Sequence, residues 1–532
     1  MILSLWDGGV SLGMSFRQKV NLYCRDKQNL DYLDEIIYFG LVRSFGSYQV
    51  ELVDSLDFSS PQILVSRTDT ISTGDLQSLS KTHSKIILHG VLTVEQCELL
   101  GVQSVSLPKS LSECSPANVN QISESSGKIV YSNNNSIGSL LSRYVRPLVR
   151  YDFQDEWNNL GFGSVKVGKG PFDVSTVYKL SNLMDEVSGV FNEGESFGSF
   201  QWVQSFGNAY VYVCSRPALT FDSYEVAAFE EFISSFSHSM DFPCVASITD
   251  ASFDYDLSVT MRLDCDESIL SSQALFSFYR ERDIPFSLAI KSNLEEAYES
   301  SYFFKEIEGA GGSLLSHSYA HLRNWGSDKK EATLDAVRSI KAFERFLPSK
   351  KIRRAVSPFH SNERYSVNAL EEVGYRGFIA GSVSSAPEYS VFRGGKVPSD
   401  RGAIVTHSQQ CMLHGDCLLE GSDPLKIPLL SAEIHNRCGA IFGYLDHPFS
   451  DRYQYGWESE NARQEVHKKL LDTLERRYKV NYLSEDEVLD IFEKKDSIQI
   501  ESGKDLVVSS SGTSFNHGVR FRGKTVGLRD LL

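Results

Sequence analysis

The sequence of 532 residues lacks several features that mark common classes of protein. It contains no run of about 18 apolar residues, so we expect no membrane-spanning helix. Its first segment, Met1 to Lys19, has no basic start followed by an apolar core, so we expect no signal peptide. It has no Cys-x-x-Cys pair, which argues against a structural zinc ribbon. The nine cysteines are odd in number and irregularly spaced, which favours reduced thiols and a cytoplasmic location.

The chain also has fewer basic than acidic residues. The chain has 53 lysines and arginines against 69 aspartates and glutamates, a net charge of -16. Such a chain has no overall basic footprint with which to displace counterions from phosphates, so we expect no nucleic-acid partner. Hydrophobic residues make up 41% of the chain, as in ordinary globular proteins. The length exceeds what one hydrophobic core usually supports, which predicts two or three domains.

Motifs for nucleotide binding and for nucleophilic catalysis are absent as well. No Gly-x-Gly-x-x-Gly, Walker loop or nucleophile elbow follows any predicted strand. Cys97 lies within a helical pattern, and we interpret it as a small buried hydrophobic residue.

The first part of the chain alternates strand-like and helical patterns. Short apolar runs predict strands at Val20–Cys24, Gln49–Val53, Gln62–Ser66, Lys85–His89, Lys128–Tyr131 and Ala209–Cys214. Helical patterns lie between several of them, including Thr93–Leu100, which Gly101 ends. From about residue 20 to residue 108, this alternation predicts a mostly parallel sheet covered on both faces. We therefore expect an α/β domain of unknown role over residues 1–238. It could serve as a scaffold or as an interaction domain for a protein partner.

The second part has sharper patterns. In Ser258–Asp264 apolar and polar residues alternate, which predicts a strand. Amphipathic helices are predicted at Asp328–Leu347, with Leu334 in its apolar stripe, and at Asn461–Tyr478. Cys438–Leu445 is predicted as an apolar strand. We expect a β/α domain over residues 239–492 and a small β-rich extension over residues 493–532, which could bind glycan or cover a sheet edge.

Potential metal ligands and proton carriers follow the predicted strands. Two histidines, His317 and His321, are four residues apart, so on a helix they would lie on one face and could reach one ion. Asp264 and Asp266 end the alternating strand, and continued strand geometry would place both carboxylates on one side. His447 follows a later strand. One carboxylate and two imidazoles form a typical catalytic zinc set, which leaves the second carboxylate to act as a base.

In order, these motifs resemble those of the polysaccharide deacetylases, the NodB-homology proteins of carbohydrate esterase family 4. The resemblance rests on Asp264-x-Asp266, Ser316–His321, Ser357-Pro358-Phe359 and Leu445-Asp446-His447, within about residues 242–492. It implies a distorted β/α barrel, a divalent metal and removal of acetyl groups from N-acetylated sugars. Zinc is the expected ion, although cobalt and nickel also suit this ligand set.

The resemblance also implies a role for each matching residue. Asp264 would be the general base, and His447 the general acid. The metal would be held by Asp266, His317 and His321. Metal-bound water would attack the acetamide carbonyl, the metal and a backbone N–H would stabilise the oxyanion, and His447 would protonate the departing amine.

The sequence departs from the family pattern at three points. Cys265 separates the two aspartates, which are usually adjacent. The arginine that usually precedes the proline of the third motif, and orients the base, is replaced around Val356, although Arg353 or Arg354 could substitute for it. The fourth motif cannot be placed, since Asp400, Asp416 and Asp423 all fit it only weakly.

Plainer interpretations of these residues stay open. Asp264 and Asp266 could cap a helix, and His447 could be a packed turn histidine. The histidines at positions 360, 407, 414 and 435 are interpreted as structural or solvated.

Substrate contacts can be proposed beside these motifs. Tyr319 and Trp325 could stack on a sugar ring, although Tyr319 could equally be a core residue. Pro358 and Phe359 are predicted to contact substrate, Phe359 as a wall of the cleft.

The sequence therefore predicts a metal-dependent deacetylase of an N-acetylated carbohydrate, either a polymer or a biosynthetic intermediate. Two rival hypotheses are a non-catalytic carbohydrate-binding protein and a scaffold of polysaccharide assembly. Hydrolysis of another amide or of an O-acetyl ester by the same metal site is a third.

Overall fold

The computed structural model of the protein describes most of the chain in two compact units. The described residues are 18–113, 127–143, 145–148, 174–216, 223–236, 239–360, 362–380, 393–408, 411–413, 415, 421, 423–450, 453–503 and 505–532. The first unit contains the described residues up to Thr249 together with Lys494–Leu532, and the second contains Asp250–Glu493. Both mix helices and strands, so the α/β class is confirmed. The predicted domains at 1–238, 239–492 and 493–532 stay a prediction, and His238 lies outside the described residues.

The first unit is built on a sheet with the strand order β2-β1-β3-β4-β11-β10-β9-β6-β7, in which β8 also pairs with β10 and with β5. The strands are β1 Val20–Tyr23, β2 Val50–Val53, β3 Ile63–Arg67, β4 Lys85–His89, β5 Gln103–Ser106, β6 Lys128–Tyr131, β7 Val145–Pro147, β8 Thr176–Lys179, β9 Glu186–Asn192, β10 Glu195–Phe206 and β11 Ala209–Cys214. From β2 to β11 the pairings are parallel, as predicted. The remaining pairings are antiparallel, so within residues 20–108 the predicted parallel arrangement was wrong for β5, which pairs antiparallel with β8. Glu193 and Gly194, both with positive φ, join β9 to β10 in a two-residue hairpin turn that the sequence patterns did not predict.

Helices accompany these strands: α1 Tyr32–Phe45, α2 Thr73–Leu79, α3 Val94–Leu100, α4 Lys109–Glu113, α5 Ser136–Leu141 and α6 Ser223–Ser234. Helix α3 is the one predicted at Thr93–Leu100. It begins after Thr93, whose hydroxyl accepts the backbone N–H of Gln96, and it ends at Gly101, which adopts the left-handed conformation. Cys97 is buried in the apolar cluster of this unit, as expected for a small hydrophobic residue.

The last residues of the chain belong to the first unit and are β-rich, as predicted. Strands β23 Gln499–Ser502 and β24 Leu506–Ser510 pair with each other, and β25 His517–Phe521 lies between β12 Ser247–Ser252 and β26 Lys524–Gly527. They enclose a small core of Ala246, Ile248, Ile498, Ile500, Val519 and Leu528.

The second unit contains a sheet with the order β18-β19-β17-β16-β15-β14-β13-β21-β20, with β22 also paired to β13. Its strands are β13 Leu257–Cys265, β14 Ser287–Ile290, β15 Leu314–Ser316, β16 Arg354–Val356, β17 Gly377–Ala380, β18 Gly395–Lys396, β19 Val405–Ser408, β20 Cys411–Met412, β21 Ile441–Asp446 and β22 Val480–Leu483. Every pairing given for this sheet is parallel except that of β18 with β19. The carboxyl ends of the parallel strands therefore meet at one edge.

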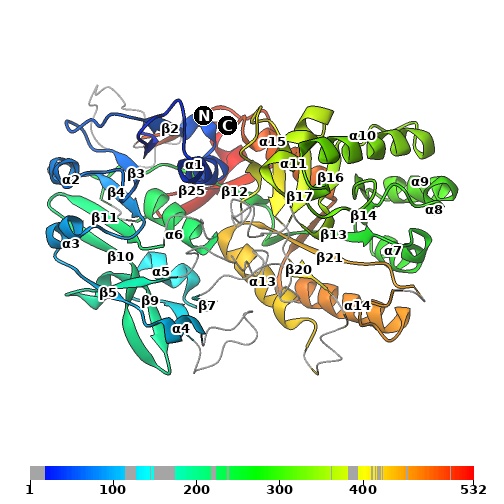
Figure 1. Ribbon diagram of the computed structural model, residues 1–532, viewed down its shortest axis with the longest axis horizontal. Coiled ribbons are helices and arrows are strands. Elements are labelled where there is room, and N and C mark those ends of the chain that lie inside the picture. The colour runs from blue at the N-terminus through cyan, green and yellow to red at the C-terminus, as the bar shows by residue number, and fades with distance from the viewer. Residues whose placement is uncertain are drawn as a thin grey trace. The chain divides into compact units, whose positions relative to one another are not determined.

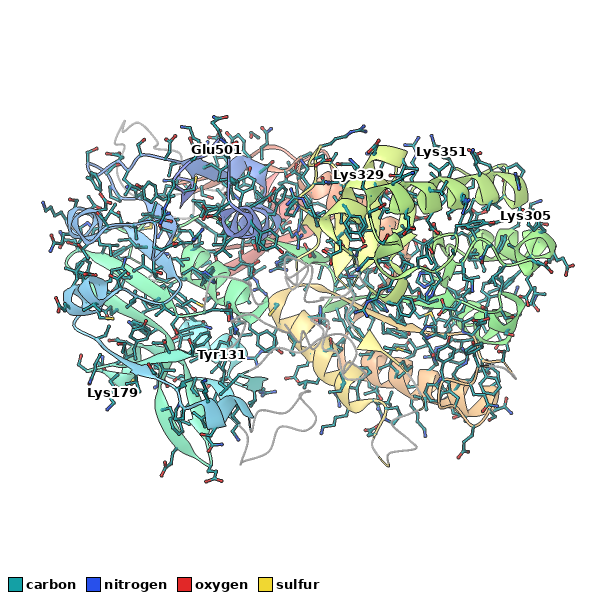
Figure 2. The ribbon with its side chains drawn as sticks, in the orientation of Figure 1. Tyr131, Lys179, Lys305, Lys329, Lys351 and Glu501 are labelled. Carbon is teal, nitrogen blue, oxygen red and sulfur yellow. The ribbon has the colours of Figure 1, made fainter. Side chains whose placement is uncertain are left out.

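Helices flank this sheet along one side, where α10, α9, α7 and α14 follow one another in Figure 1. The helices of the unit are α7 Gln273–Arg280, α8 Glu296–Glu299, α9 Ser301–Gly309, α10 Lys329–Phe346, α11 Arg364–Val373, α13 Lys426–Cys438, α14 Glu460–Arg477 and α15 Glu485–Lys495. The exposed Lys305 lies on α9, and the exposed Lys351 lies in the connection between α10 and β16 (Figure 2). None of the helices in the described part of the chain is long and apolar enough to cross a membrane.

Two predicted elements of this unit differ in detail. Helix α10 forms as expected, but Leu334 of its predicted apolar stripe is 47% exposed, because small residues such as Ala332, Ala336 and Ser339 form the buried face. Cys438 was predicted to begin a strand, but it ends α13, where Gly439 adopts the left-handed conformation and the strand β21 begins only at Ile441.

Candidate metal centre

The sheet of the second unit brings the predicted site residues to one edge. Asp264 lies at the end of β13, His317 follows β15, and His447 follows β21. In the sheet β21 is the neighbour of β13, and β14 separates β13 from β15. Since all these strands are parallel, residues distant in the sequence converge where the strands end.

Three side chains converge on one point at this edge. The Nε2 atoms of His317 and His321 are 3.1 Å apart, and each lies 3.2 Å from Oδ1 of Asp266. Ligands held tetrahedrally at zinc by bonds of about 2.0–2.1 Å would lie roughly 3.3 Å from one another. The three donor atoms therefore fit one divalent metal ion, with at least one further position open.

The spacing of the two histidines suggested a helix, but the pair does not lie on one. Both residues belong to the loop that follows β15, before the short 3-10 helix η6 Arg323–Trp325. Ser318 and His321 have positive φ angles, and the Ser318 hydroxyl accepts the backbone N–H of His321 at 2.8 Å. The tight loop, rather than one helical turn, thus brings the two imidazoles together.

A carboxylate on α10 supports this loop. The buried Asp335 accepts the backbone N–H groups of Tyr319 and Ala320 at 2.8 and 2.9 Å. Deeper in the unit, the Ser316 and Ser339 hydroxyls are hydrogen-bonded at 2.7 Å. Asp335 was missed from the sequence, because the polar face of a helix usually meets solvent.

The orientation of His317 is fixed by the backbone. Its Nδ1 lies 2.9 Å from the carbonyl oxygen of Val356, which can only accept, so Nδ1 carries the hydrogen. In the neutral ring, Nε2 then presents its lone pair toward Asp266 and His321. Such an outer hydrogen bond is typical of metal-ligating histidines.

The electrostatics of the cluster suit a cation. Burial, and then the neighbouring His317, lower the pKa of His321 to about 4, so its ring is neutral near pH 7. Burial raises the pKa of Asp266, but His317 and the other imidazoles outweigh it and hold the pKa below the usual range. Neutral imidazole and ionised carboxylate are the forms that bind metal. Burial lowers the pKa of His317, but Asp264 and Asp266 outweigh it and raise the pKa above the usual range, so a metal would displace a proton from this ring.

Asp264 lies beside the cluster and is almost fully buried. Its Oδ1 accepts a hydrogen bond from Nε of Arg262 at 2.9 Å, and its Oδ2 lies 4.0 Å from Nε2 of His360. Burial raises the pKa of this carboxyl, but the opposing effect of Arg262, and then of His317 and His360, is larger. The pKa is therefore below its usual range, and the carboxyl is ionised. No helix begins at Asp264 or Asp266, which rules out the capping interpretation.

His447 approaches the cluster from β21. Its Nε2 lies 3.7 Å from Oδ2 of Asp266, and its ring stacks on Tyr455 with 4.1 Å between centroids and 13° between planes. Its backbone is fixed as well, because its N–H donates to Asp446 Oδ1 at 2.7 Å and its carbonyl accepts from Arg463. A stacked, anchored imidazole has a fixed orientation toward whatever occupies the metal position.

The four predicted substrate residues differ in their accessibility. Phe359 is 45% exposed, and its ring lies 4.7 Å from that of His321. Tyr319 is half-buried under the guanidinium of Arg338. Pro358 and Trp325 are buried, and the indole N–H of Trp325 points to the hydroxyl of Ser357 at 3.4 Å. The ring of Trp325 is therefore closed to a sugar, and Phe359 is the open aromatic surface.

The candidates for the missing family residues lie elsewhere. Arg354 pairs with Asp490 and Glu493 of α15, and Arg353 is exposed, so neither supports Asp264. Among the candidates for the fourth motif, Asp400 binds Lys329 and Asn368, and Asp423 accepts the backbone N–H of Leu425. Asp416 and His414 lie outside the described residues.

Three of the four histidines interpreted as structural or solvated lie within the described residues, and all three are buried. His360, His407 and His435 are at most 5% exposed, and burial followed by Arg262 lowers the pKa of His360 to about 3. His360 was interpreted as structural or solvated, but it lies at the edge of the site.

A second group of possible ligands occurs in the first unit, formed by His89, Cys214 and Glu225. All three are buried, but the Glu225 carboxylate already accepts from the guanidinium of Arg216. We therefore take the cluster around Asp266 as the candidate metal centre.

Sequence comparison adds no relative, since no protein-family model and no curated protein sequence matches the chain. Comparison with solved structures finds polysaccharide deacetylases. A probable polysaccharide deacetylase from Pseudomonas aeruginosa PAO1 is 10% identical, with a TM-score of 0.36 over 46% of this chain and 92% of that one. The chitin deacetylase of Colletotrichum lindemuthianum is 16% identical, with a TM-score of 0.28 over 42% and 84%.

A carbohydrate esterase family 4 pseudoenzyme from Bacillus anthracis is also similar, at 14% identity and a TM-score of 0.29 over 44% of this chain and 66% of that one. The solved structures named here are polysaccharide deacetylases and a pseudoenzyme of carbohydrate esterase family 4, the family that the motifs from Asp264 to His447 also resemble.

Proposed function

We propose that the protein is a metal-dependent deacetylase that hydrolyses the acetamide of an N-acetylated sugar, in a polysaccharide or in its biosynthetic intermediate. The observation that carries this proposal is the convergence of ligand atoms of Asp266, His317 and His321 within 3.2 Å of one another, with His447 3.7 Å from Asp266. The proposed ion is Zn²⁺, and the proposed form of the second unit is a distorted β/α barrel.

The bound metal would polarise the acetyl carbonyl and activate water. Asp264, ionised and held beside the cluster, would accept a proton from the attacking water. His447, in its protonated form, would donate a proton to the amide nitrogen as the carbon–nitrogen bond breaks. One water is consumed, and acetate and the free sugar amine are released. The exposed ring of Phe359 beside His321 would contact the apolar face of the sugar.

Metal binding can be tested without knowledge of the substrate. The purified protein is incubated with Zn²⁺, separated from free ion and submitted to elemental analysis. We expect about one zinc per chain in the wild type, and its loss in His317→Ala, because one of three protein ligands is removed. His83→Ala, which changes an exposed histidine of the first unit, serves as the control and should keep the ion. A wild type that stays empty would refute the proposal.

The reaction is tested by acetate release from chitooligosaccharides and from peptidoglycan fragments. Asp264→Ala should lower kcat by roughly 10²–10⁴-fold while zinc remains bound, because a general base typically contributes that much. Comparison of N-acetyl with O-acetyl substrates separates amide from ester hydrolysis. Zinc binding without acetate release from any of them would instead favour a non-catalytic carbohydrate-binding protein.

A further inference from the structure

Arg262 and Asp264 lie on the same face of β13. Side chains two residues apart in a strand point to one side, and here both are buried, with exposures of 2% and 1%. The guanidinium Nε of Arg262 donates to Oδ1 of Asp264 at 2.9 Å. A buried charge-assisted hydrogen bond of this length restricts rotation of the carboxylate about its own axis.

A second carboxylate forms a longer ion pair with the guanidinium. Its Nη1 lies 4.0 Å from Oε1 of Glu485, the first residue of α15, which is fully buried. Glu485 is fixed in turn, because its Oε2 lies 3.4 Å from Nδ1 of His407 and its backbone N–H donates to the hydroxyl of Ser287. Arg262 is therefore buried between two carboxylates, hydrogen-bonded to Asp264 and ion-paired at longer range with Glu485.

This arrangement leaves the second oxygen of Asp264 for the reaction. Oδ1 is engaged by Arg262, whereas Oδ2 lies on the side of His360, at 4.0 Å from its Nε2. The two arginines near the third motif do not hold this carboxylate, since Arg354 binds α15 and Arg353 is exposed.

We propose that Arg262 is the positioning residue of the base: its Nε fixes Oδ1 of Asp264 so that Oδ2 faces the attacking water. The inference rests on the proposed function, because it assigns Arg262 a role in that reaction. Arg262 thus supports Asp264 from the same strand, β13, two residues before it. Fixing the geometry of a reacting group can change a rate by about 10²-fold.

The kinetic test uses Arg262→Met, Arg262→Lys and Asp264→Asn. We expect Arg262→Met to lower kcat by roughly 10–100-fold, with KM and bound zinc within about twofold of the wild type. Arg262→Lys keeps the charge but has no donor at the Nε position, so its kcat should be intermediate. In the Asp264→Asn background, Arg262→Met should lower kcat no further, because Arg262 acts only through that carboxylate.

Arg354→Met is the matched control, since it removes a buried arginine from carboxylates on α15 and should leave kcat unchanged. A wild-type kcat in Arg262→Met, or in Arg262→Lys if the methionine variant does not fold, would overturn the proposal, and so would full additivity with Asp264→Asn. If Asp264→Asn is as active as the wild type, the proposed function fails instead.

A crystal structure of Arg262→Met, or of Arg262→Lys, gives a readout that does not depend on a substrate. We expect the Asp264 carboxylate to rotate or to occupy several orientations, with the ligand atoms of Asp266, His317 and His321 unmoved. An Asp264 carboxylate in its original orientation would show that Arg262 does not position it.

Discussion

Cys265 shows how a single residue between two aspartates is compatible with the site. It ends β13 with its thiol 3.6 Å from the hydroxyl of Ser272, and it is fully buried. Burial raises the pKa of this thiol far above its ordinary value, so it is neutral and no rival ligand to the carboxylates. The strand ends at Cys265, between the two aspartates, and Oδ1 of Asp266 still lies 3.2 Å from Nε2 of His317.

Tyr455 is a second residue that the sequence patterns did not single out. Its ring lies nearly parallel to that of His447 and comes from a later loop, in which Tyr455 itself has a positive φ. Tyr455→Leu should lower kcat by about 2–10-fold, because the loss of a flat stacked ring of this kind corresponds to roughly 0.5–1.5 kcal/mol. The measurement is kcat for acetate release under saturating substrate.

Tyr455→Phe keeps the ring and removes only the hydroxyl, so it is expected to retain wild-type kcat. If the phenylalanine variant is as slow as the leucine variant, the hydroxyl rather than the stacked ring supports His447. Tyr453→Leu is a useful neighbour, since its ring stacks on Tyr455 at 6.0 Å and not on the histidine.

At the scale of elements, the site depends on loops that follow strands. The His317–His321 loop is fixed by its own turn, by Asp335 of α10 and by the carbonyl of Val356 at the end of β16. Each of these supports comes from a different element of the second unit. The precision of the cluster is therefore a property of how neighbouring strands and α10 pack, not of the loop alone.

Gly312 lies two residues before β15, where the chain passes close to Phe286, the residue before β14. A Cβ atom at this position would be 2.0 Å from the carbonyl oxygen of Phe286 and 2.7 Å from Cγ2 of Ile307. Gly312→Ala should therefore lower the free energy of unfolding by about 1–3 kcal/mol, because backbone has to move to accommodate the methyl group. Denaturant unfolding measures the change.

Gly309 offers the matched control in the same connection. It is the last residue of α9, and a Cβ there meets nothing within 4 Å. Gly309→Ala should be neutral or stabilising by up to about 1 kcal/mol, since alanine favours a helix more than glycine does. Equal destabilisation by both substitutions would show that the close contact with Phe286 is not the cause.

At the scale of the whole molecule, the two ends of the chain contribute to one unit. Residues beyond Lys494 supply Ile498, Ile500, Val519 and Leu528 to a core that also contains Ala246 and Ile248. Gln49 reinforces this junction, because its side-chain N–H donates to the Ala246 carbonyl and its Oε1 accepts from the Ser502 hydroxyl, both at 2.8 Å. The β-rich extension is thus part of the hydrophobic core of the first unit.

Val519→Ala tests the contribution of this extension. Val519 is fully buried in β25, so its truncation should lower the free energy of unfolding by roughly 2 kcal/mol through lost burial and a small cavity. Val507→Ala in β24 removes the same atoms from a residue that is 52% exposed and should change little. An equally small effect at both positions would mean that the extension is not a structural part of the unit.

Local pattern determined much of this protein without the structure. The alternation from Ser258 to Asp264, the helix that Thr93 and Gly101 delimit, and the β-rich extension follow from neighbouring residues alone. The meeting of the candidate ligands at one edge could also be predicted. Each of them follows a predicted strand, and the carboxyl ends of parallel strands lie at the same edge of a sheet whatever the loops contain. Asp264, Asp266, His317, His321 and His447 could therefore be proposed together from the sequence.

Only the tertiary structure decided what lies around those residues. The roles of Arg262, Asp335 and Tyr455, the burial of Trp325 and the loop geometry of the histidine pair depend on contacts between segments far apart in the chain or on φ angles that no sequence spacing fixes. A period in the sequence reports which face of an element a side chain occupies. It does not report which other element that face meets, and that contact sets the hydrogen bonds, the charges and the accessibility of the site.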